Sequence, residues 1–364
     1  MKTFLFITIF VLSLSCSDKH FEKVDVINPE YIPKTIFNSS EDLTSPKFEQ
    51  LRTKYQLDTV FHGETDEFKR ILLLRHWIKT VMPIDDVGDP YPGSGYVDSI
   101  LDAALTGVGF HCGHFMRVQS AVMNAYGYVT RTLGAGPGEQ GGPDGHHGIN
   151  EIWLNSYNKW FLSDAKYDHH FEKDGIPLSA LEIRDEYLKN NGADILMADR
   201  PERKSFDVDQ ETGTTKVRYT QTYTWLEWHA FNNLFTAWPK DTTLLLMYAD
   251  DYFNKHTWIW GGKPHWAYST KYLILEKNRK SFEWTPNTIS SEVRINGNKA
   301  VILLESVTPN LKSYQMKEQD TDVWQSVSDS LEITLKNNEY ELLFRTINLA
   351  DVAGPEHKIV IVGK

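Results

Sequence analysis

Two alternating segments joined by a short polar stretch are the feature that most constrains how this chain can fold. In "HHGINEIWLNSYNKWFLSD", residues 146–164, apolar and polar residues alternate on both sides of "NSYN". Alternation with a period of two is typical of half-buried strands, and "NSYN" is typical of a turn. With residues 155–158 as the turn, Trp153 faces Trp160 across a hairpin. The hairpin fixes which side chains share a face.

That register places a histidine near a carboxylate. Ile149 lies opposite Asp164, and His147 is the diagonal neighbour of Asp164 on the same face. Diagonal neighbours are about 7–8 Å apart at the backbone, within reach of longer side chains. His146 points to the other face. A turn of odd length would send His147 and Asp164 to opposite faces, because one residue of slip flips every side chain.

A helix is predicted directly after the cysteine of "GFHCGHFM", residues 109–116. Spacings of three and four indicate one buried face, formed by Phe115, Met116, Gln119, Val122, Met123 and Tyr126. Gly127 is a natural stop. Cys112 therefore lies at or just before a helix N-terminus, where free N–H groups and the helix dipole favour a thiolate. The alternative is an inert buried cysteine, which is a common core residue.

The N-terminus, "MKTFLFITIFVLSLSCSDKH", combines one lysine, a short apolar run and small residues. The run is shorter than the roughly 20 residues that a membrane-spanning helix needs, and it is typical of a secretory signal in residues 1–15. "SLSC" resembles the end of a bacterial lipoprotein signal, in which Cys16 receives lipid; an ordinary secreted protein is the alternative. We expect an exported chain anchored in the bacterial cell envelope through Cys16, on the periplasmic or surface face of the outer membrane.

The number of cysteines and the net charge of the chain limit the functions that it could have. The chain has two cysteines, so a lipidated Cys16 leaves Cys112 without a disulfide partner, and an odd thiol in an exported protein suggests a reactive group. The net charge is −11, which argues against nucleic acid as a partner. No cofactor is expected.

The chain divides into five predicted regions: a signal peptide at 1–15, a tether and N-terminal segment at 16–60, a core at 61–200, an aromatic-rich extension at 201–284 and a β-sandwich at 285–364. In the core, periodicity predicts a helix from Thr65 to Val81, then a loop at 84–99, a strand at 128–133 and a glycine-rich loop at 134–148. In the extension, "WLEWHAFNNLFTAW" predicts a helix. Its aromatic residues suggest core or a carbohydrate-stacking surface. Short alternating strands after 285 predict an immunoglobulin-like sandwich.

Three motifs in this order resemble the transglutaminase-like superfamily, which has a papain-like cysteine fold. They are "GFHCGHFMRVQSAVMNAYGYVTRTL", "HGINEIWL" and "NKWFLSD", within about residues 65–170. The resemblance implies an α+β fold in which the helix that bears the nucleophile packs on an antiparallel sheet. It implies Cys112 as nucleophile, His147 as base and Asp164 as the residue that orients the base. The chain departs from the family at Ile149 and Ala165, where the family often has an aromatic residue and a proline.

Other residues are expected to support this site. His111 and His114 would tune or shield the thiol, and His146 is a second candidate for the base. Asn150 and Trp160 would support the hairpin from behind, and Glu151 would be a salt-bridge partner or a pocket wall. No histidine or cysteine spacing matches a recognised zinc site, so no metal is expected.

These features predict an enzyme that cleaves amide or peptide bonds through a thioester, with hydrolysis favoured over cross-linking. The alternative is a surface lipoprotein that binds polysaccharide or cleaves it by elimination on the same fold. A binding protein with an inactive triad is a third possibility. The substrate would accordingly be a protein, a peptide or a polysaccharide.

Overall fold

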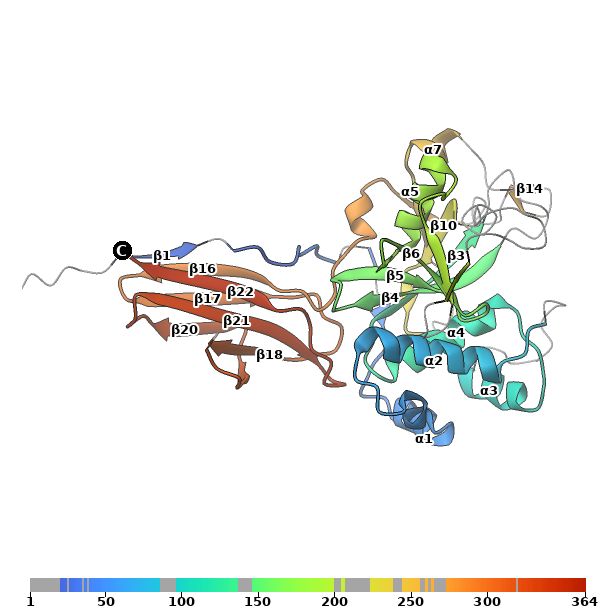
Figure 1. The fold of residues 1–364 in the computed structure, drawn as a ribbon, viewed down its shortest axis with the longest axis horizontal. Coiled ribbons are helices and arrows are strands. Elements are labelled where there is room, and N and C mark those ends of the chain that lie inside the picture. Colours follow the sequence, from blue (N-terminus) through green and yellow to red (C-terminus); the bar gives the residue numbers. More distant parts are fainter. Residues whose placement is uncertain are drawn as a thin grey trace, which may run out of the picture.

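The fold is known from a computed structural model (Figure 1). The structure describes residues 20–24, 26–34, 36–37, 39–85, 96–136, 146–199, 204–206, 223–237, 244–255, 259–260, 263–264, 273–318 and 320–364. The predicted signal peptide, Cys16 and most of the glycine-rich loop lie outside these residues. The described part is a mixed α+β structure with several sheets and few helices.

A six-stranded sheet forms the centre of the part that bears the helices. Its order is β15-β12-β10-β3-β4-β5, with β3 at Thr130–Gly136, β4 at His147–Leu154, β5 at Lys159–Ser163, β10 at Trp225–His229, β12 at Leu245–Tyr248 and β15 at Leu273–Glu276. The predicted hairpin is confirmed: Trp153 pairs with Trp160 and Glu151 with Leu162. Its neighbours β3 and β10 are antiparallel, as expected, whereas β12 and β15 pair in parallel.

Alternation along the strands divides the core between the two faces of this sheet. Ile152, Leu154 and Phe161 face one cluster with the helices α1 (Lys47–Lys54), η1 (Leu57–Phe61), α2 (Glu67–Val81), α3 (Val97–Leu105) and α4 (Cys112–Asn124). Trp153 and Trp160 face a second cluster, which includes residues of α5 (Ala180–Asn190). The remaining short helices are α7 (Asp251–Lys255) and η4 (Arg279–Ser281).

Several predicted element types or bounds were wrong. Residues 225–229 form a strand rather than a helix, because they lie between β3 and β12, where the sheet takes their backbone hydrogen bonds. Helix α2 begins at Glu67, two residues after the predicted start at Thr65, because the side chain of Asp66 caps it. Helix α3 begins inside the predicted loop at 84–99.

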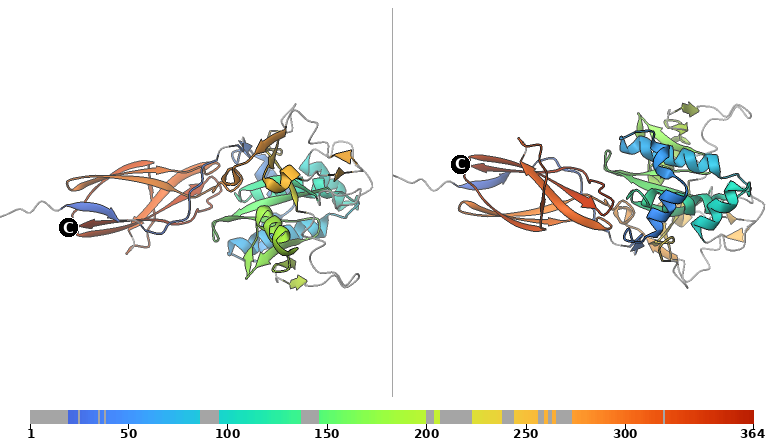
Figure 2. Two further views of the ribbon diagram at one scale, coloured as in Figure 1. Left: turned by 90° about the horizontal axis from the view of Figure 1, so that it is seen from above. Right: turned by 90° about the horizontal axis from the view of Figure 1, so that it is seen from below.

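Two further sheets share a core at the other end of the molecule (Figure 2). One has three strands, β16 (Ser290–Asn296), β17 (Lys299–Glu305) and β20 (Ser330–Thr334). The other has five strands, β1 (Phe21–Val24), β22 (His357–Gly363), β21 (Glu339–Asn348), β18 (Leu311–Glu318) and β19 (Gln325–Val327). Strand β1 comes from the predicted tether: Phe21 is buried in this core and the strand pairs with β22.

The other strands make small sheets around the central one: β6 (His169–Lys173), β7 (Ile176–Pro177), β8 (Leu196–Asp199) and β9 (Lys204–Phe206) in one, β2 (Ser39–Ser40) with β11 (Phe231–Asn232), and β13 (Ile259–Trp260) with β14 (Lys263–Pro264). Among the helices of the described residues, none has both the length and the apolar character that a membrane crossing needs.

Candidate active site

Cys112 is the first residue of α4, as the sequence predicted. His111 is the N-cap, and its Nδ1 accepts a hydrogen bond from the backbone N–H of Gly113 at 3.1 Å. A histidine ring thus takes the place of the serine or aspartate side chain that usually caps a helix. The cap fixes the ring of His111 beside the thiol.

The surroundings of Cys112 favour its thiolate. Burial on its own would raise the pKa of this thiol. Hydrogen bonds with His111 and His147, the positive charge of His147 and the backbone N–H of Gly148 outweigh burial and lower the pKa to about 5. Cys112 is therefore largely ionised at neutral pH.

His147 links the thiol to a buried carboxylate. Its Nε2–H donates to Oδ2 of Asp164 at 2.6 Å, which leaves Nδ1 as the ring nitrogen for the thiol. Burial favours the neutral ring, but the charge of Asp164 and the hydrogen bond to it prevail and raise the pKa of His147 to about 10. Burial likewise opposes ionisation of Asp164, yet His147 holds the pKa of that carboxyl well below its usual range.

The hairpin explains why these two residues meet. Asn150 pairs with Ser163, so the next residue, Asp164, lies level with Ile149 and diagonal to His147. Asp164 is held at the end of β5 because its backbone exchanges hydrogen bonds with that of His169, at 3.0 and 3.2 Å. The structure thus brings Cys112, His147 and Asp164 together.

Two neighbours of Asp164 were not predicted for this site. The backbone N–H of Tyr167 donates to Asp164 Oδ1 at 3.2 Å, and the Tyr167 ring lies 5.5 Å from that of His147. His169 Nε2 lies 3.8 Å from Asp164 Oδ2, and burial lowers the pKa of His169 to about 4. His169 is therefore neutral at pH 7, so His147 rather than His169 is the cation that pairs with Asp164. The run "DAKYDHH", residues 164–170, is a local signal for these neighbours, because it places a tyrosine and two histidines within six residues of Asp164.

A second buried network was also missed. Asp168 accepts from Arg75 Nε at 2.9 Å and contacts His76 Nδ1 at 2.7 Å. Arg75 also contacts His170 at 3.1 Å, and His170 contacts Glu172 at 2.9 Å. These contacts tie the turn after Asp164 to helix α2. No local pattern reveals them, because Arg75 and His76 lie far from the turn in the sequence.

His146 makes a separate pair with a buried acid. Its Nε2 lies 3.3 Å from Glu227 Oε1, on β10. Both side chains cover Gly134, where an added Cβ would come within 2.7 Å of Glu227 and 2.8 Å of His146. Gly134 pairs with Gly148, whose N–H reaches the thiol. His146 therefore adjoins the site, and the acid it pairs with is Glu227.

The remaining predicted residues serve the surrounding structure. His114 is buried, and its ring packs on those of Phe110 and His111 at 4.8 and 4.1 Å. Asn150 is fully buried on the α4 side of the sheet.

Glu151 and Trp160 lie on the opposite face. Glu151 Oε2 is 2.7 Å from Arg131 and accepts from Trp228 Nε1 at 2.8 Å, so it is a salt-bridge partner rather than a pocket wall. Trp160 donates to the carbonyl of Trp284 at 2.7 Å and lies 4.2 Å from the guanidinium of Arg131. Neither residue is part of the thiol site.

Two features of the described residues bear on the metal and carbohydrate alternatives. Within these ranges, no group of three or more His, Cys, Asp or Glu side chains could hold a metal ion. Two tryptophans of the extension whose aromatic residues suggested a carbohydrate surface, Trp225 and Trp228, are core residues and at most 2% exposed.

Comparisons with known proteins add little to this picture. No family model matches the chain. No curated protein matches it either. Among solved structures, it is similar to a "Putative Cysteine Protease from Cytophaga hutchinsonii", at 13% identity over 37% of this chain and 40% of that chain, with a TM-score of 0.26. The match spans less than half of that protein, and a TM-score this low has no bearing on the fold or activity of this chain.

Proposed function

We propose that the chain is a cysteine enzyme that cleaves amide or peptide bonds. The observation that carries this proposal is the hydrogen-bonded series from Cys112 through His147 to Asp164, with the thiol pKa lowered to about 5 and the imidazole pKa raised to about 10. Between these two values the pair exists as thiolate and imidazolium. That is the state a thiol nucleophile needs.

The reaction would proceed in two steps. The sulfur of Cys112 attacks the carbonyl carbon, the C–N bond breaks, and the proton on His147 goes to the leaving amine, which leaves a thioester. Water then attacks the thioester as His147 takes its proton, and the acid and the thiolate are released. Asp164 keeps the ring oriented through its 2.6 Å hydrogen bond.

The start of α4 offers a donor for the oxyanion. The N–H of Gly113 binds the His111 ring and the N–H of His114 binds the His111 carbonyl. This leaves the N–H of Cys112 itself as the first-turn donor nearest the reacting carbon. Hydrolysis is preferred over transfer to an amine because it requires only water.

The molecular setting is proposed on sequence grounds. The core would be transglutaminase-like, and the two sheets near the C-terminus an immunoglobulin-like sandwich. The chain would be exported and held in the cell envelope by lipid on Cys16, with a protein or peptide as substrate.

Alkylation by iodoacetamide as a function of pH tests the proposal. The Cys16→Ser variant is the background, because Cys112 is then the remaining thiol of the two in the sequence. We expect the rate to rise through a midpoint near pH 5, because the thiolate is the reactive form. In His147→Ala the midpoint should move toward the ordinary thiol value of about 8.5.

An unreactive Cys112 thiol, or the same alkylation midpoint with and without His147→Ala, would contradict the proposal. If the midpoint behaves as expected, hydrolysis of peptide and amide libraries by the parent protein and by Cys112→Ser identifies the substrate.

A further inference from the structure

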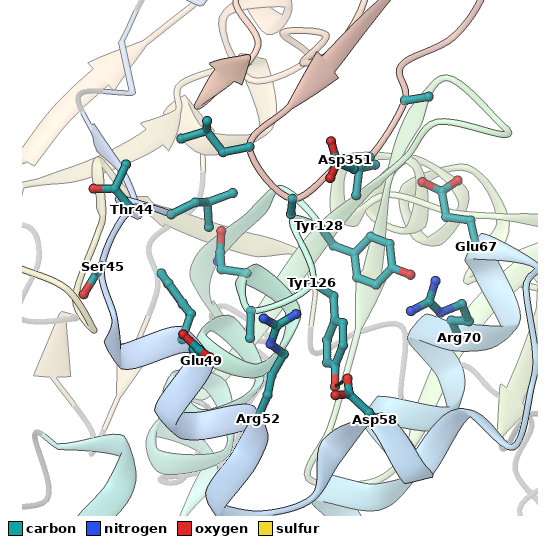
Figure 3. Close-up of a pocket in the computed structure, with 18 of the residues that line it drawn as sticks. Thr44, Ser45, Glu49, Arg52, Asp58, Glu67, Arg70, Tyr126, Tyr128 and Asp351 are labelled. Atoms are coloured by element: carbon teal, nitrogen blue, oxygen red, sulfur yellow. Dashed lines mark hydrogen bonds between the residues drawn. The ribbon is translucent and has the colours of Figure 1, made fainter. Parts of the chain in front are cut away.

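A cavity of about 840 Å³ lies at the end of α4 opposite Cys112 (Figure 3). Residues of α1, α2 and the C-terminal end of α4 line it, together with residues 349–353, which follow β21. Helix α4 has 13 residues and is therefore about 20 Å long, so this cavity is distinct from the thiol site.

Two arginines lie close to one tyrosine ring in the cavity. The guanidinium carbons of Arg52 and Arg70 lie 5.6 and 5.9 Å from the centre of the Tyr126 ring, and Figure 3 shows both side chains beside it. Arg70 also lies 4.0 Å over the ring of Phe61. Aromatic faces attract these cations but supply no hydrogen-bond acceptor in the plane of the guanidinium.

Neither guanidinium has an ion-pair or hydrogen-bond partner within the part of the chain that the structure describes. For Arg70 this includes Nε, which is buried. A buried donor without an acceptor is costly. A ligand that supplied the acceptor would therefore bind favourably.

The acids of the cavity are largely engaged elsewhere. Asp58 accepts from the Tyr126 hydroxyl at 2.8 Å, and Asp351 pairs with Lys312 at 2.6 Å. Glu67 accepts from Asn155 Nδ2 at 2.7 Å and from two backbone N–H groups. The fourth, Glu49, is exposed on α1.

We propose that this cavity binds a small ligand through one anionic group, a carboxylate or a phosphate, attracted by the guanidinium groups of Arg52 and Arg70, which both line the cavity. Guanidinium groups match both oxyanions in geometry and charge. The hydroxyl of Tyr128 points toward the side of the cavity that holds Arg70 (Figure 3), where it can donate to the same group. The acids nearby disfavour a polyanion, so the ligand carries a single charged group among neutral polar ones.

Isothermal titration calorimetry of the full chain tests this with three probes: D-glucuronate, D-glucose and inorganic phosphate. We expect at least one anion to bind and glucose not to bind. Glucuronate alone would assign a carboxylate ligand, phosphate alone a phosphate ligand, and both together a general oxyanion site. Cys112→Ser should bind as the parent does, because the site is independent of the proposed thiol chemistry.

Matched variants sharpen the test. Arg52→Gln and Arg70→Gln should each weaken anion binding by about tenfold or more, because each loses a charge-assisted hydrogen bond. Glu49→Gln should tighten binding, because it removes a repulsive charge at the rim. Arg294→Gln, which removes an exposed arginine paired with Glu292 outside the cavity, should leave binding unchanged.

No binding of either anion at millimolar concentration, binding of glucose as tight as that of glucuronate, or equal affinities in the parent and the Arg52→Gln protein would overturn the proposal. If Arg70→Gln does not fold, Arg52→Gln decides, since that side chain is half-buried on α1.

Discussion

The hydrogen-bond partners of the Cys112 thiol come from two places in the sequence, one next to Cys112 and one far from it. His111 is the adjacent residue and acts through the helix cap. His147 and the N–H of Gly148 come from the start of β4. The thiol therefore depends on both a local cap and a long-range packing of α4 on the sheet, and each contribution can be removed separately.

Asp164→Asn should raise the pKa of Cys112. Without the carboxylate charge, burial makes the neutral ring of His147 more stable than the imidazolium. A neutral ring does not stabilise a thiolate. We expect the alkylation midpoint to rise by at least about one pH unit, and any amidase turnover to fall roughly 10²- to 10⁴-fold. Asp174→Asn, at an exposed turn, is the matched control. An unchanged midpoint in Asp164→Asn would contradict the role of Asp164.

At the scale of elements, helix α4 joins two features of the molecule. Its first residue is Cys112, and its C-terminal end lines the cavity that holds Arg52 and Arg70. The helix ends before Gly127, which has a φ of +75° and lies against Ala350 and Val352 of the C-terminal part. A glycine is required there because a Cβ would come within 2.6 Å of Ala350.

The cap of α4 can be tested apart from the imidazole that forms it. His111→Ala removes both the hydrogen bond to Gly113 and the contact with the thiol, so it should cost about 0.5–2 kcal/mol of stability and raise the pKa of Cys112. His111→Asn restores a capping oxygen without a ring; we expect it to recover most of the stability in urea denaturation but not the low alkylation midpoint. If His111→Asn also restored the midpoint, the cap alone would lower the thiol pKa.

At the scale of the whole molecule, one buried asparagine links the C-terminal sheets to the helical part. Asn348 donates through Nδ2 to the Gly127 carbonyl at 2.8 Å, and its Oδ1 accepts from the N–H groups of Ala350 and Val352, both at 3.0 Å. All three backbone groups depend on this one side chain, which is 1% exposed.

Asn348→Ala should therefore destabilise the protein by about 2–4 kcal/mol, because it leaves three backbone groups without the partner they have now. The measurement is urea denaturation followed by tryptophan fluorescence. Asn337→Ala, at an exposed turn, should change stability by less than about 0.5 kcal/mol. A similar loss in both variants would show that Asn348 has no special role at the junction.

Short-range patterns in the sequence determine much of this protein by themselves. The alternation around "NSYN" determines the hairpin register, because side chains on a strand repeat every two residues. The spacing of apolar residues after Cys112 determines a helix that begins there. Both patterns lie within one or two adjacent elements, where geometry follows directly from sequence.

Only the tertiary structure decided the rest. Residues 225–229 became a strand because β3 and β12 flank them, although their apolar residues suggested a helix. Strand β1 pairs with β22, which lies at the other end of the sequence. Glu227 of β10 lies beside His146, although 81 positions separate them in the sequence. Arg52 and Arg70 were brought to one ring by the packing of α1 and α2 against the end of α4. Such contacts join residues far apart in the chain, so their partners are set by how the elements pack and not by any local period.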